Sequence, residues 1–314
     1  MSQTILVTGG AGYIGSAVVD ALVRFGHNVT VFDNLSTGQQ DKVHPGAIFI
    51  NGDITDYKAV QTLFTDISFD SVIHLAAKKS VGESEQNPAL YFHTNVIGSC
   101  NLLSAMTEAC VPRIIFSSTA AVYAPSKSDL PITENNLSGP VSVYGRTKLM
   151  VEDIIGEYCR TGKIKSYNIL RYFNVAGDAG LSYIEQDAQN VFPILKNSLL
   201  SQTPFHIFGT DYNTRDGTCV RDYIHLTDLV DAHVKAIEFE GNEVFNIGTG
   251  TGYTVRELIE VFEKVSGKKV KVIESPRREG DVALVTASAK KAAQYLKWTP
   301  HCTLEEMVES TFIF

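Results

Sequence analysis

The sequence predicts an α/β protein in which a doubly wound parallel sheet precedes a smaller, mixed α/β lobe. Three observations support this fold class. Short apolar runs alternate with helical segments from the first residues to Arg171, a pattern typical of a parallel sheet. A glycine-rich turn joins the first strand to the first helix. After Asn174 the alternation stops and a less regular region begins.

Apolar runs and helical periodicity indicate each element of the first region. The predicted elements, in chain order, are a strand at 5–8, a helix at 16–25, strands at 28–32 and 47–51, a short helix at 60–64, a strand at 71–77, a helix at 90–110, a strand at 112–117, a helix at 145–160 and a strand at 165–171. Ligands of such sheets bind where the carboxyl ends of the strands meet.

The second region is predicted to contain fewer strands and more loops. Its predicted elements are a helix at 190–200, a strand at 206–209, a helix at 226–238, a strand at 243–248, a helix at 254–266, a strand at 269–273 and a helical tail at 287–298 and 303–312. The strand at 243–248 is suited to rejoin the main sheet. We therefore expect a nucleotide-binding domain at 1–174, with about 226–248 returning to it, and a substrate lobe at 175–225 and 249–314.

Composition excludes several classes of function. The 314 residues carry a formal net charge of −8, which argues against a nucleic-acid partner. No apolar run approaches the ~18 residues of a membrane span, so we expect no membrane partner. The five cysteines lack metal-ligand spacing, so we expect no metal site. Scattered cysteines and the lack of a visible export signal favour reduced thiols in the cytoplasm.

The glycine turn is the first functional signal. Gly9, Gly12 and Gly15 follow an apolar strand and open a helix, the arrangement of a Rossmann dinucleotide site. Glycines let the backbone approach a pyrophosphate, and the helix N-terminus attracts its charge. Asp33 ends the second strand, where a carboxylate accepts hydrogen bonds from a ribose and repels a 2′-phosphate. The sequence therefore predicts NAD rather than NADP.

Further cofactor contacts are predicted at strand ends and at helix positions beside them. The pair Asp53 and Ile54 has two interpretations: it contacts the adenine of the cofactor, or Asp53 is the N-cap of the helix that follows. The complete set of predicted cofactor contacts is Gly9, Gly12, Tyr13, Ile14, Gly15, Asp33, Asn34, Asp53, Ile54, Leu75, Ala76, Lys79, Asn95, Ser117, Tyr144, Lys148 and Tyr172.

Tyr144 and Lys148 form the second functional signal. They are four residues apart at the start of a predicted helix, so they share one face. A nearby ammonium and an oxidised nicotinamide both stabilise a phenolate, which can then accept the proton of an alcohol. Thr119, at the end of the fifth strand, can bond the same hydroxyl. These three residues are the predicted catalytic group.

Nearly the whole chain resembles the extended short-chain dehydrogenase/reductase family, and within it the UDP-hexose 4-epimerases. The resemblance rests on the segments Val7–Ser16, Asp33–Leu35, Gly52–Ile54, Val81–Ser84, Phe116–Tyr123, Leu170–Asn174, Asp216–His225 and Arg277–Asp281. It implies that NAD stays bound while C4 of a UDP-hexose is oxidised to a ketone and reduced on its other face. UDP-galactose and UDP-glucose would be interconverted in this way.

The resemblance also implies the substrate contacts. The hexose meets Thr119 and Tyr144, and guanidinium groups suit the diphosphate because they pair with phosphate bidentately. The remaining substrate contacts are Asn174, Asn190, Phe208 beside the uracil, Arg221 and Arg278 on the diphosphate, Asp281 on the ribose, and Val285 beside the hexose. The family further implies a homodimer formed through the helices at 90–110 and 145–160; the sequence alone also allows a monomer.

Some features of the chain differ from the family pattern. Thr119 stands where serine is commoner, Ala124 where glycine is usual, and Val285 where some members have tyrosine. The smaller Val285 leaves room for an N-acetyl group, so UDP-N-acetylhexosamines are possible substrates. A 4,6-dehydratase is disfavoured because Ala120 and Ala121 offer no acid or base. A dehydrogenase that releases NADH, an epimerase of UDP-pentoses or UDP-uronates, and a non-catalytic nucleotide-sugar sensor remain as alternatives.

Overall fold

The structure is a computed structural model, and it describes residues 2–125, 130–183, 190–278 and 280–312. The chain divides into two compact units. The first unit comprises Met1–Ala124, Leu137–Arg171 and Val230–Phe245; the second comprises Pro125–Asn136, Tyr172–Leu229 and Asn246–Phe314. Each unit is described separately below.

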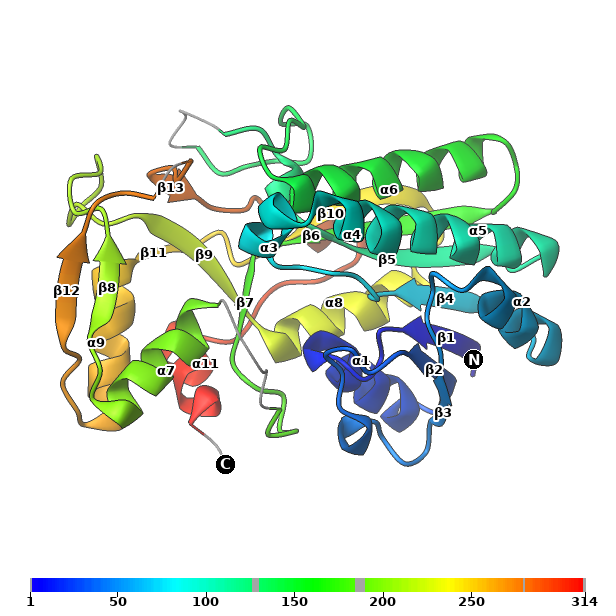
Figure 1. The fold of residues 1–314 in the computed structure, drawn as a ribbon, viewed down its shortest axis with the longest axis horizontal. Coiled ribbons are helices and arrows are strands. Elements are labelled where there is room, and N and C mark those ends of the chain that lie inside the picture. The colour runs from blue at the N-terminus through cyan, green and yellow to red at the C-terminus, as the bar shows by residue number, and fades with distance from the viewer. Residues whose placement is uncertain (1, 126–129, 184–189, 279, 313–314) are drawn as a thin grey trace. The chain divides into compact units, whose positions relative to one another are not determined.

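A seven-stranded sheet forms the centre of the first unit, as predicted (Figure 1). Its strands, in spatial order, are β10 (Asn242–Ile247), β6 (Ser166–Tyr172), β5 (Arg113–Thr119), β4 (Ser71–His74), β1 (Thr4–Thr8), β2 (Asn28–Asp33) and β3 (Ile48–Asn51). Val7 of β1 lies opposite Val31 on one side and Ile73 on the other, both in parallel register. The chain order reverses direction at β1, which is where open α/β sheets bind dinucleotides.

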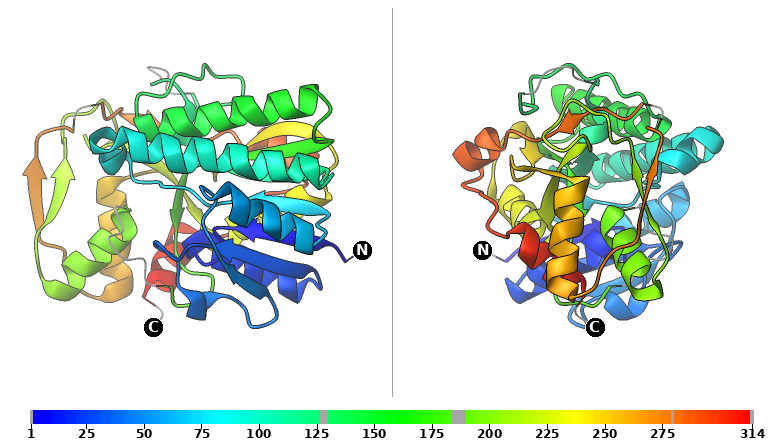
Figure 2. Two further views of the ribbon diagram at one scale, coloured as in Figure 1. Left: turned by 45° about the vertical axis from the view of Figure 1, so that its right-hand side comes forward. Right: turned by 90° about the vertical axis from the view of Figure 1, so that its left-hand side faces the viewer.

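Helices pack on this sheet through buried apolar side chains. They are α1 (Tyr13–Arg24), α2 (Tyr57–Asp66), α3 (Val81–Gln86), α4 (Pro88–Tyr91), α5 (Gly98–Glu108), α6 (Val143–Arg160) and α8 (Leu226–Glu238), with short 3-10 turns η1 (Gln40–Lys42) and η3 (Ala120–Val122). The helices α5 and α6 run side by side (Figure 2). Their buried faces, with that of α2, meet the sheet in one core that includes Leu103, Phe116 and Ile155.

The predicted helix at 90–110 is interrupted. Between α4 and α5 the chain forms a π-helical turn, η2 (Phe92–Ile97). Such a turn inserts one extra residue into a helix and is frequent at functional sites. Here it contains Asn95, whose side chain is buried. Apolar periodicity did not reveal the interruption because the apolar residues continue on both sides of it.

The second unit contains two small sheets and a separate core. Its elements are β7 (Asn174–Ala176), α7 (Val191–Ser201), β8 (Phe205–Phe208), β9 (Val220–His225), β11 (Gly252–Thr254), α9 (Val255–Ser266), β12 (Val272–Ser275), β13 (Leu284–Val285), α10 (Lys290–Tyr295) and α11 (Leu304–Thr311). Phe192 of α7 meets Phe262 of α9 edge to face, and Val308 of α11 joins the same core. The strand expected at 269–273 is found at Val272–Ser275, and the helix expected at 287–298 is limited to Lys290–Tyr295.

The two units differ from the predicted domains at several boundaries, since 172–174, 226–229 and 246–248 also fall in the second unit. Pro125–Asn136 groups with the second unit, although we expected all of 1–174 to form one domain. Ile132 explains the placement of Pro125–Asn136 because it forms a parallel bridge to Ala287 and its backbone N–H donates to Thr286. Among the described residues, every helix is too short or too polar to cross a membrane.

Candidate active site

The glycine turn between β1 and α1 is closely packed. Gly9 has a φ of +73°, and a Cβ there would lie 2.6 Å from the backbone nitrogen of Ala76. A Cβ on Gly15 would lie 2.0 Å from the carbonyl oxygen of Gly9. Only glycine fits these two positions. Gly12 is the N-cap of α1 and has no side chain to cap it, so this helix N-terminus suits a phosphate.

The predicted ribose and adenine residues form a linked loop cluster. Asp33 is buried at the end of β2 and accepts hydrogen bonds from the backbone N–H groups of Ala11 and Leu35. Asn34 donates to a carboxylate oxygen of Asp53 at 2.7 Å. Burial raises the pKa of Asp53, but hydrogen bonds from Thr55 and Asn34 outweigh it and leave the pKa below its ordinary value. The carboxylate of Asp53 is therefore held in its charged form.

The predicted catalytic residues lie at the start of α6 and the end of β5. Ser142 caps α6 by accepting from the backbone N–H of Gly145. The backbone N–H of Tyr144 donates to the Ser84 hydroxyl at 3.1 Å, which fixes the first turn. Thr119 is the last residue of β5, and its side chain accepts from the backbone N–H of Ala121.

Lys148 is buried one turn after Tyr144. Its ammonium donates to the carbonyl oxygen of Ser117 at 2.8 Å and lies 4.7 Å from the centre of the Phe116 ring. Burial lowers the pKa of Lys148 from 10.5 to about 7, and the negative charge of Glu152 opposes this fall. The lysine is thus close to losing its proton near neutral pH, and its charge depends on its neighbours.

A buried chain of hydrogen bonds joins β1 to α6. Thr8 contacts Nδ1 of His74 at 2.7 Å, and Nε2 of His74 contacts the Ser99 hydroxyl at 2.8 Å. Ser99 donates its single proton to the carbonyl of Asn95, so His74 must carry its proton on Nε2. Burial, and secondarily the charge of Lys148, lower the pKa of His74 to about 3, so the ring is neutral.

Asn95 continues this chain of hydrogen bonds to α6, the helix that carries Tyr144 and Lys148. Its amide nitrogen donates to the carbonyl of Lys78 and to the Thr147 hydroxyl at 3.0 Å, while its oxygen accepts from the Lys78 N–H. Thr147 in turn donates to the carbonyl of Tyr144 at 2.8 Å. Both amide protons of Asn95 are therefore committed to the protein, so its structural role is to link the chain after β4 to α6.

The other predicted cofactor residues of the sheet lie at strand ends. Leu75 and Ala76 follow β4, and both backbone N–H groups donate to the carbonyl of Thr8. Ser117 lies in β5 and contacts His233. The remaining predicted cofactor residues lie at the ends of other elements. Ile54 is buried and follows β3, Lys79 is exposed and follows β4, and Tyr172 is the last residue of β6. Tyr13 and Ile14 are the first two residues of α1.

In the second unit, the predicted diphosphate and ribose residues have distinct environments. Arg221, on β9, donates to a carboxylate oxygen of Asp281 at 3.1 Å and to the carbonyl of Val282. The guanidinium of Arg278 lies 3.9 Å from the centre of the Phe208 ring. In the part of the chain that the structure describes, Arg278 has no carboxylate partner. Arg278 is thus the arginine best suited to receive a phosphate.

The remaining predicted substrate residues surround β7 and β9. Asn174 donates to the carbonyl of Asp222 at 2.9 Å. Asn190 caps α7 and donates to the carbonyl of Val175. Val285 lies on β13 opposite Arg221 in parallel register. The structure therefore collects Asn174, Arg221 and Val285 on neighbouring strands.

Sequence reasoning missed two organising residues of the second unit. Asp222 is fully buried and accepts hydrogen bonds from the backbone N–H groups of Thr249, Gly250 and Ala287. Tyr212 is also buried, and its hydroxyl has no hydrogen-bond partner within the described ranges. The only sequence signal for Asp222 is its place beside Arg221 in the motif at 216–225. From sequence alone, a carboxylate next to a functional arginine is interpreted as the ion-pair partner of that arginine.

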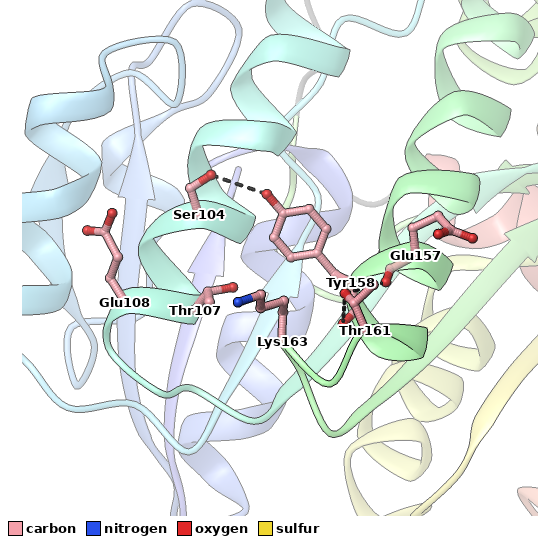
Figure 3. A pocket seen from close by; sticks show the side chains of 7 residues that line it. All are labelled: Ser104, Thr107, Glu108, Glu157, Tyr158, Thr161 and Lys163. Carbon is pink, nitrogen blue, oxygen red and sulfur yellow. Dashed lines mark hydrogen bonds between the residues drawn. The ribbon is translucent and has the colours of Figure 1, made fainter.

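A surface pocket lies apart from the predicted catalytic residues. It has a volume of about 410 Å³ and opens between the C-terminal ends of α5 and α6 (Figure 3). Its lining residues are Ser104, Thr107, Glu108, Glu157, Tyr158, Thr161 and Lys163. None of them is a predicted site residue, and we assign no function to the pocket.

Comparison with known proteins gives a consistent result. Residues 5–248 match the model of the NAD dependent epimerase/dehydratase family. The chain is 43% identical to the UDP-glucose 4-epimerase of Halalkalibacterium halodurans, over 98% of this chain and 94% of the relative. It is similar to the structure of a UDP-glucose-4-epimerase from Stenotrophomonas maltophila with bound NAD and formylated UDP-arabinopyranose, with a TM-score of 0.94 and 36% identity over 99% and 97% of the two chains. It also matches the UDP-Glc/GlcNAc 4-epimerase of Campylobacter jejuni, with a TM-score of 0.88 and 35% identity over 99% and 98%.

Proposed function

The chain belongs to the NAD dependent epimerase/dehydratase family, and we propose that it is a UDP-hexose 4-epimerase that interconverts UDP-galactose and UDP-glucose. The observation that carries this proposal is the arrangement around α6, where Tyr144 precedes the buried ammonium of Lys148 by one turn. That arrangement suits proton removal from a sugar hydroxyl. The similarity of nearly the whole chain to UDP-sugar 4-epimerases supports the same conclusion.

NAD fits the residues of the first unit. The glycine turn and the N-terminus of α1 would hold its pyrophosphate, and Asp33 would accept from its adenosine ribose. The Asp33 carboxylate would repel a 2′-phosphate, which favours NAD over NADP. When bound, NAD supplies a reversible acceptor for the hydride on C4 of the sugar.

The residues of the protein then act on the oxygen at C4. Tyr144, as phenolate, accepts the proton of the 4-hydroxyl, and Thr119 orients that hydroxyl through a hydrogen bond. The ammonium of Lys148 stabilises the phenolate electrostatically. Loss of this proton and of the C4 hydride leaves a ketone that is planar at C4, so a hydride returned to its other face, with a proton from Tyr144 to the oxygen, gives the C4 epimer. No net oxidation occurs.

Epimerisation requires a firm grip on the nucleotide and a loose grip on the hexose, because the sugar must turn over. In our proposal, Arg278 and Arg221 hold the diphosphate, Phe208 packs against the uracil and Asp281 accepts from the ribose. Asn174 and Asn190 contact the substrate, and both are already oriented by backbone carbonyls.

Conversion without added cofactor tests the proposal. Purified protein is incubated with UDP-galactose alone, and the anomeric signals are followed by proton NMR. UDP-glucose should appear, and Y144F should form none at the same protein concentration. Absence of conversion even with NAD supplied would refute the UDP-hexose assignment, and UDP-pentoses and UDP-uronates would then be tested before a non-catalytic sensor is considered.

The substrate range depends on Val285. A valine on β13 is smaller than a tyrosine, so we propose that UDP-N-acetylglucosamine and UDP-N-acetylgalactosamine are also accepted. The similarity to an epimerase named for both Glc and GlcNAc supports this extension. A parallel NMR sample with UDP-N-acetylglucosamine tests it.

We propose further that two copies pair through α5 and α6 as a homodimer. Large apolar side chains on or beside these helices are exposed, among them Phe92, Ile97 and Met150. Burying them against a second copy would remove apolar surface from water. Light scattering should give twice the monomer mass, and I97K should lower it. The five free cysteines fit a reducing compartment, so we propose a cytoplasmic location, which cell fractionation would test.

A further inference from the structure

Glu152 is a buried carboxylate on the catalytic helix. It lies four residues after Lys148 and eight after Tyr144, so the three side chains follow one stripe of α6. Only 5% of Glu152 is exposed. The motif that identifies Tyr144 and Lys148 does not include it, and helical charge patterns predict an exposed glutamate at most such positions.

Two residues, Arg171 and Ser118, hold this carboxylate in one place. Arg171 of β6 donates to both of its oxygens, from Nε at 3.0 and 3.1 Å and from Nη2 at 2.5 Å. The hydroxyl of Ser118 donates to it as well. Arg171 is itself buried, with its guanidinium 4.8 Å from the centre of the Tyr123 ring. Such a bidentate pair fixes the orientation of the carboxylate.

The pair stands beside the catalytic lysine. In β5, Ser118 lies between Ser117 and Thr119. The carbonyl of Ser117 accepts the hydrogen bond from the Lys148 ammonium. The charge of Glu152 favours the protonated form of Lys148, against the desolvation that lowers the lysine's pKa. Arg171 carries the opposite charge just beyond Glu152. Three buried side chains of alternating charge, Lys148, Glu152 and Arg171, thus extend from α6 to β6.

We propose that Glu152 is a positioning residue that sets the charge of Lys148, and through it the readiness of Tyr144 to take a proton. This inference rests on the proposed epimerase function. Glu152 need not touch substrate or cofactor. Its negative charge keeps the buried lysine an ammonium ion in the working range of pH, and Arg171 limits that effect while holding the carboxylate in place.

Other titratable groups around α6 are accounted for. His74 of β4 faces Lys148 but is neutral, as its low pKa requires. His233 of α8 contacts the Ser117 hydroxyl. On α3, Glu85 accepts a hydrogen bond from the backbone N–H of Val143, the first residue of α6. Glu83 accepts a hydrogen bond from the Tyr91 hydroxyl. Among these groups, Glu152 is the charge that acts on Lys148 from the buried side, and Arg171 is the ion-pair partner of Glu152.

The test compares the pH dependence of kcat in E152Q, R171Q and the double variant E152Q/R171Q. Loss of the Lys148 proton should define the alkaline limb. E152Q should move that limb to lower pH by about one unit, the size expected for a charge one helical turn away at an effective dielectric near 20 after partial compensation. R171Q leaves Glu152 uncompensated and should move the limb to higher pH.

The two single variants separate charge from structure. Each leaves a buried charge without its partner, so both should unfold at lower temperature than the wild type. The loss of stability has the same sign in both variants, whereas the shift of the alkaline limb should have opposite signs in E152Q and R171Q. The double variant removes both charges, should recover much of the lost stability and should place the limb between those of E152Q and R171Q. E152D, which keeps the charge, should retain the wild-type limb.

A matched control is available on the same helix. Glu157 accepts from Arg160 much as Glu152 accepts from Arg171, but both side chains are exposed. E157Q should leave the profile unchanged. A second readout is the ultraviolet absorbance of the Tyr144 phenolate, taken as the difference from Y144F: E152Q should require a higher pH to form it.

The outcomes distinguish this inference from the proposed function. A wild-type protein that converts no UDP-sugar contradicts the proposed function. An active wild type whose limb and phenolate titration are unchanged in E152Q and in the double variant, or are shifted the same way in E152Q and R171Q, overturns the role of Glu152 and leaves the epimerase function standing.

Discussion

Replacing Lys148 by methionine should abolish epimerisation and at the same time stabilise the fold. Methionine matches the length of the lysine stem but carries no charge. In the wild type, burial lowers the pKa of Lys148 from 10.5 to about 7, so folding disfavours the ammonium ion. At ~1.36 kcal/mol for each pH unit, this amounts to roughly 4 kcal/mol at pH 7. Loss of the hydrogen bond to Ser117 lowers the stability of the variant by about 1 kcal/mol, so the free energy of unfolding of K148M should exceed that of the wild type by about 3 kcal/mol.

The sign of the pH dependence follows from the same shift. Between pH 7 and 10.5 the unfolded chain binds more protons at this position than the folded chain does, so the wild type gains stability as pH rises. The advantage of K148M should therefore shrink from pH 7 to pH 10 and be nearly gone at the upper end. Below about pH 7 it should be constant.

Urea unfolding of the two proteins at several pH values, with the same excess of NAD in every sample, measures this difference. K58M, at an exposed lysine of α2, is the control and should differ from the wild type by the same small amount at every pH. A stability difference between K148M and wild type that does not change from pH 7 to pH 10 would refute the reasoning, because folding would then not lower the pKa of Lys148.

Three other substitutions test separate parts of the site. G15A should lose bound NAD and with it nearly all activity, because the added Cβ would lie 2.0 Å from the carbonyl oxygen of Gly9; NAD released on denaturation, measured by absorbance, checks this, and retention of a full equivalent would contradict it. R278A should raise KM for UDP-galactose about 10- to 100-fold with little change in kcat, the effect of removing one charge-assisted phosphate contact; initial-rate kinetics decide, and an unchanged KM would count against the assignment. V285Y should reduce turnover of UDP-N-acetylglucosamine much more than that of UDP-galactose, and an equal loss on both substrates would show that this side chain does not select the sugar.

The features predicted correctly from sequence are those with a local physical cause. Gly9 and Gly15 are needed by the backbone itself, so the glycine turn could be placed without the rest of the fold. Strands β1 and β5 of the main sheet contain short continuous apolar runs because both of their faces are covered. Tyr144 and Lys148 share a helix face by spacing alone.

The features that sequence reasoning missed depend on contacts between distant segments. The strand β9 (Val220–His225) is rich in polar residues, and its partners β7, β11 and β13 are two or three residues long, so no pattern marks them. Ile132 joins the second unit through a bridge to Ala287 that local sequence does not predict. Glu152 reads as a solvated glutamate until Arg171 and Ser118 are seen beside it.

The central claim is that the hydrogen on C4 leaves and returns within the active site. The direct test is to incubate the protein, without added NAD, with UDP-galactose deuterated at C4 in ordinary water and to examine the product by NMR and mass spectrometry. The account predicts UDP-glucose that retains deuterium at C4. UDP-glucose with protium from water at C4 would contradict it, because the carbon would then have exchanged its hydrogen with solvent.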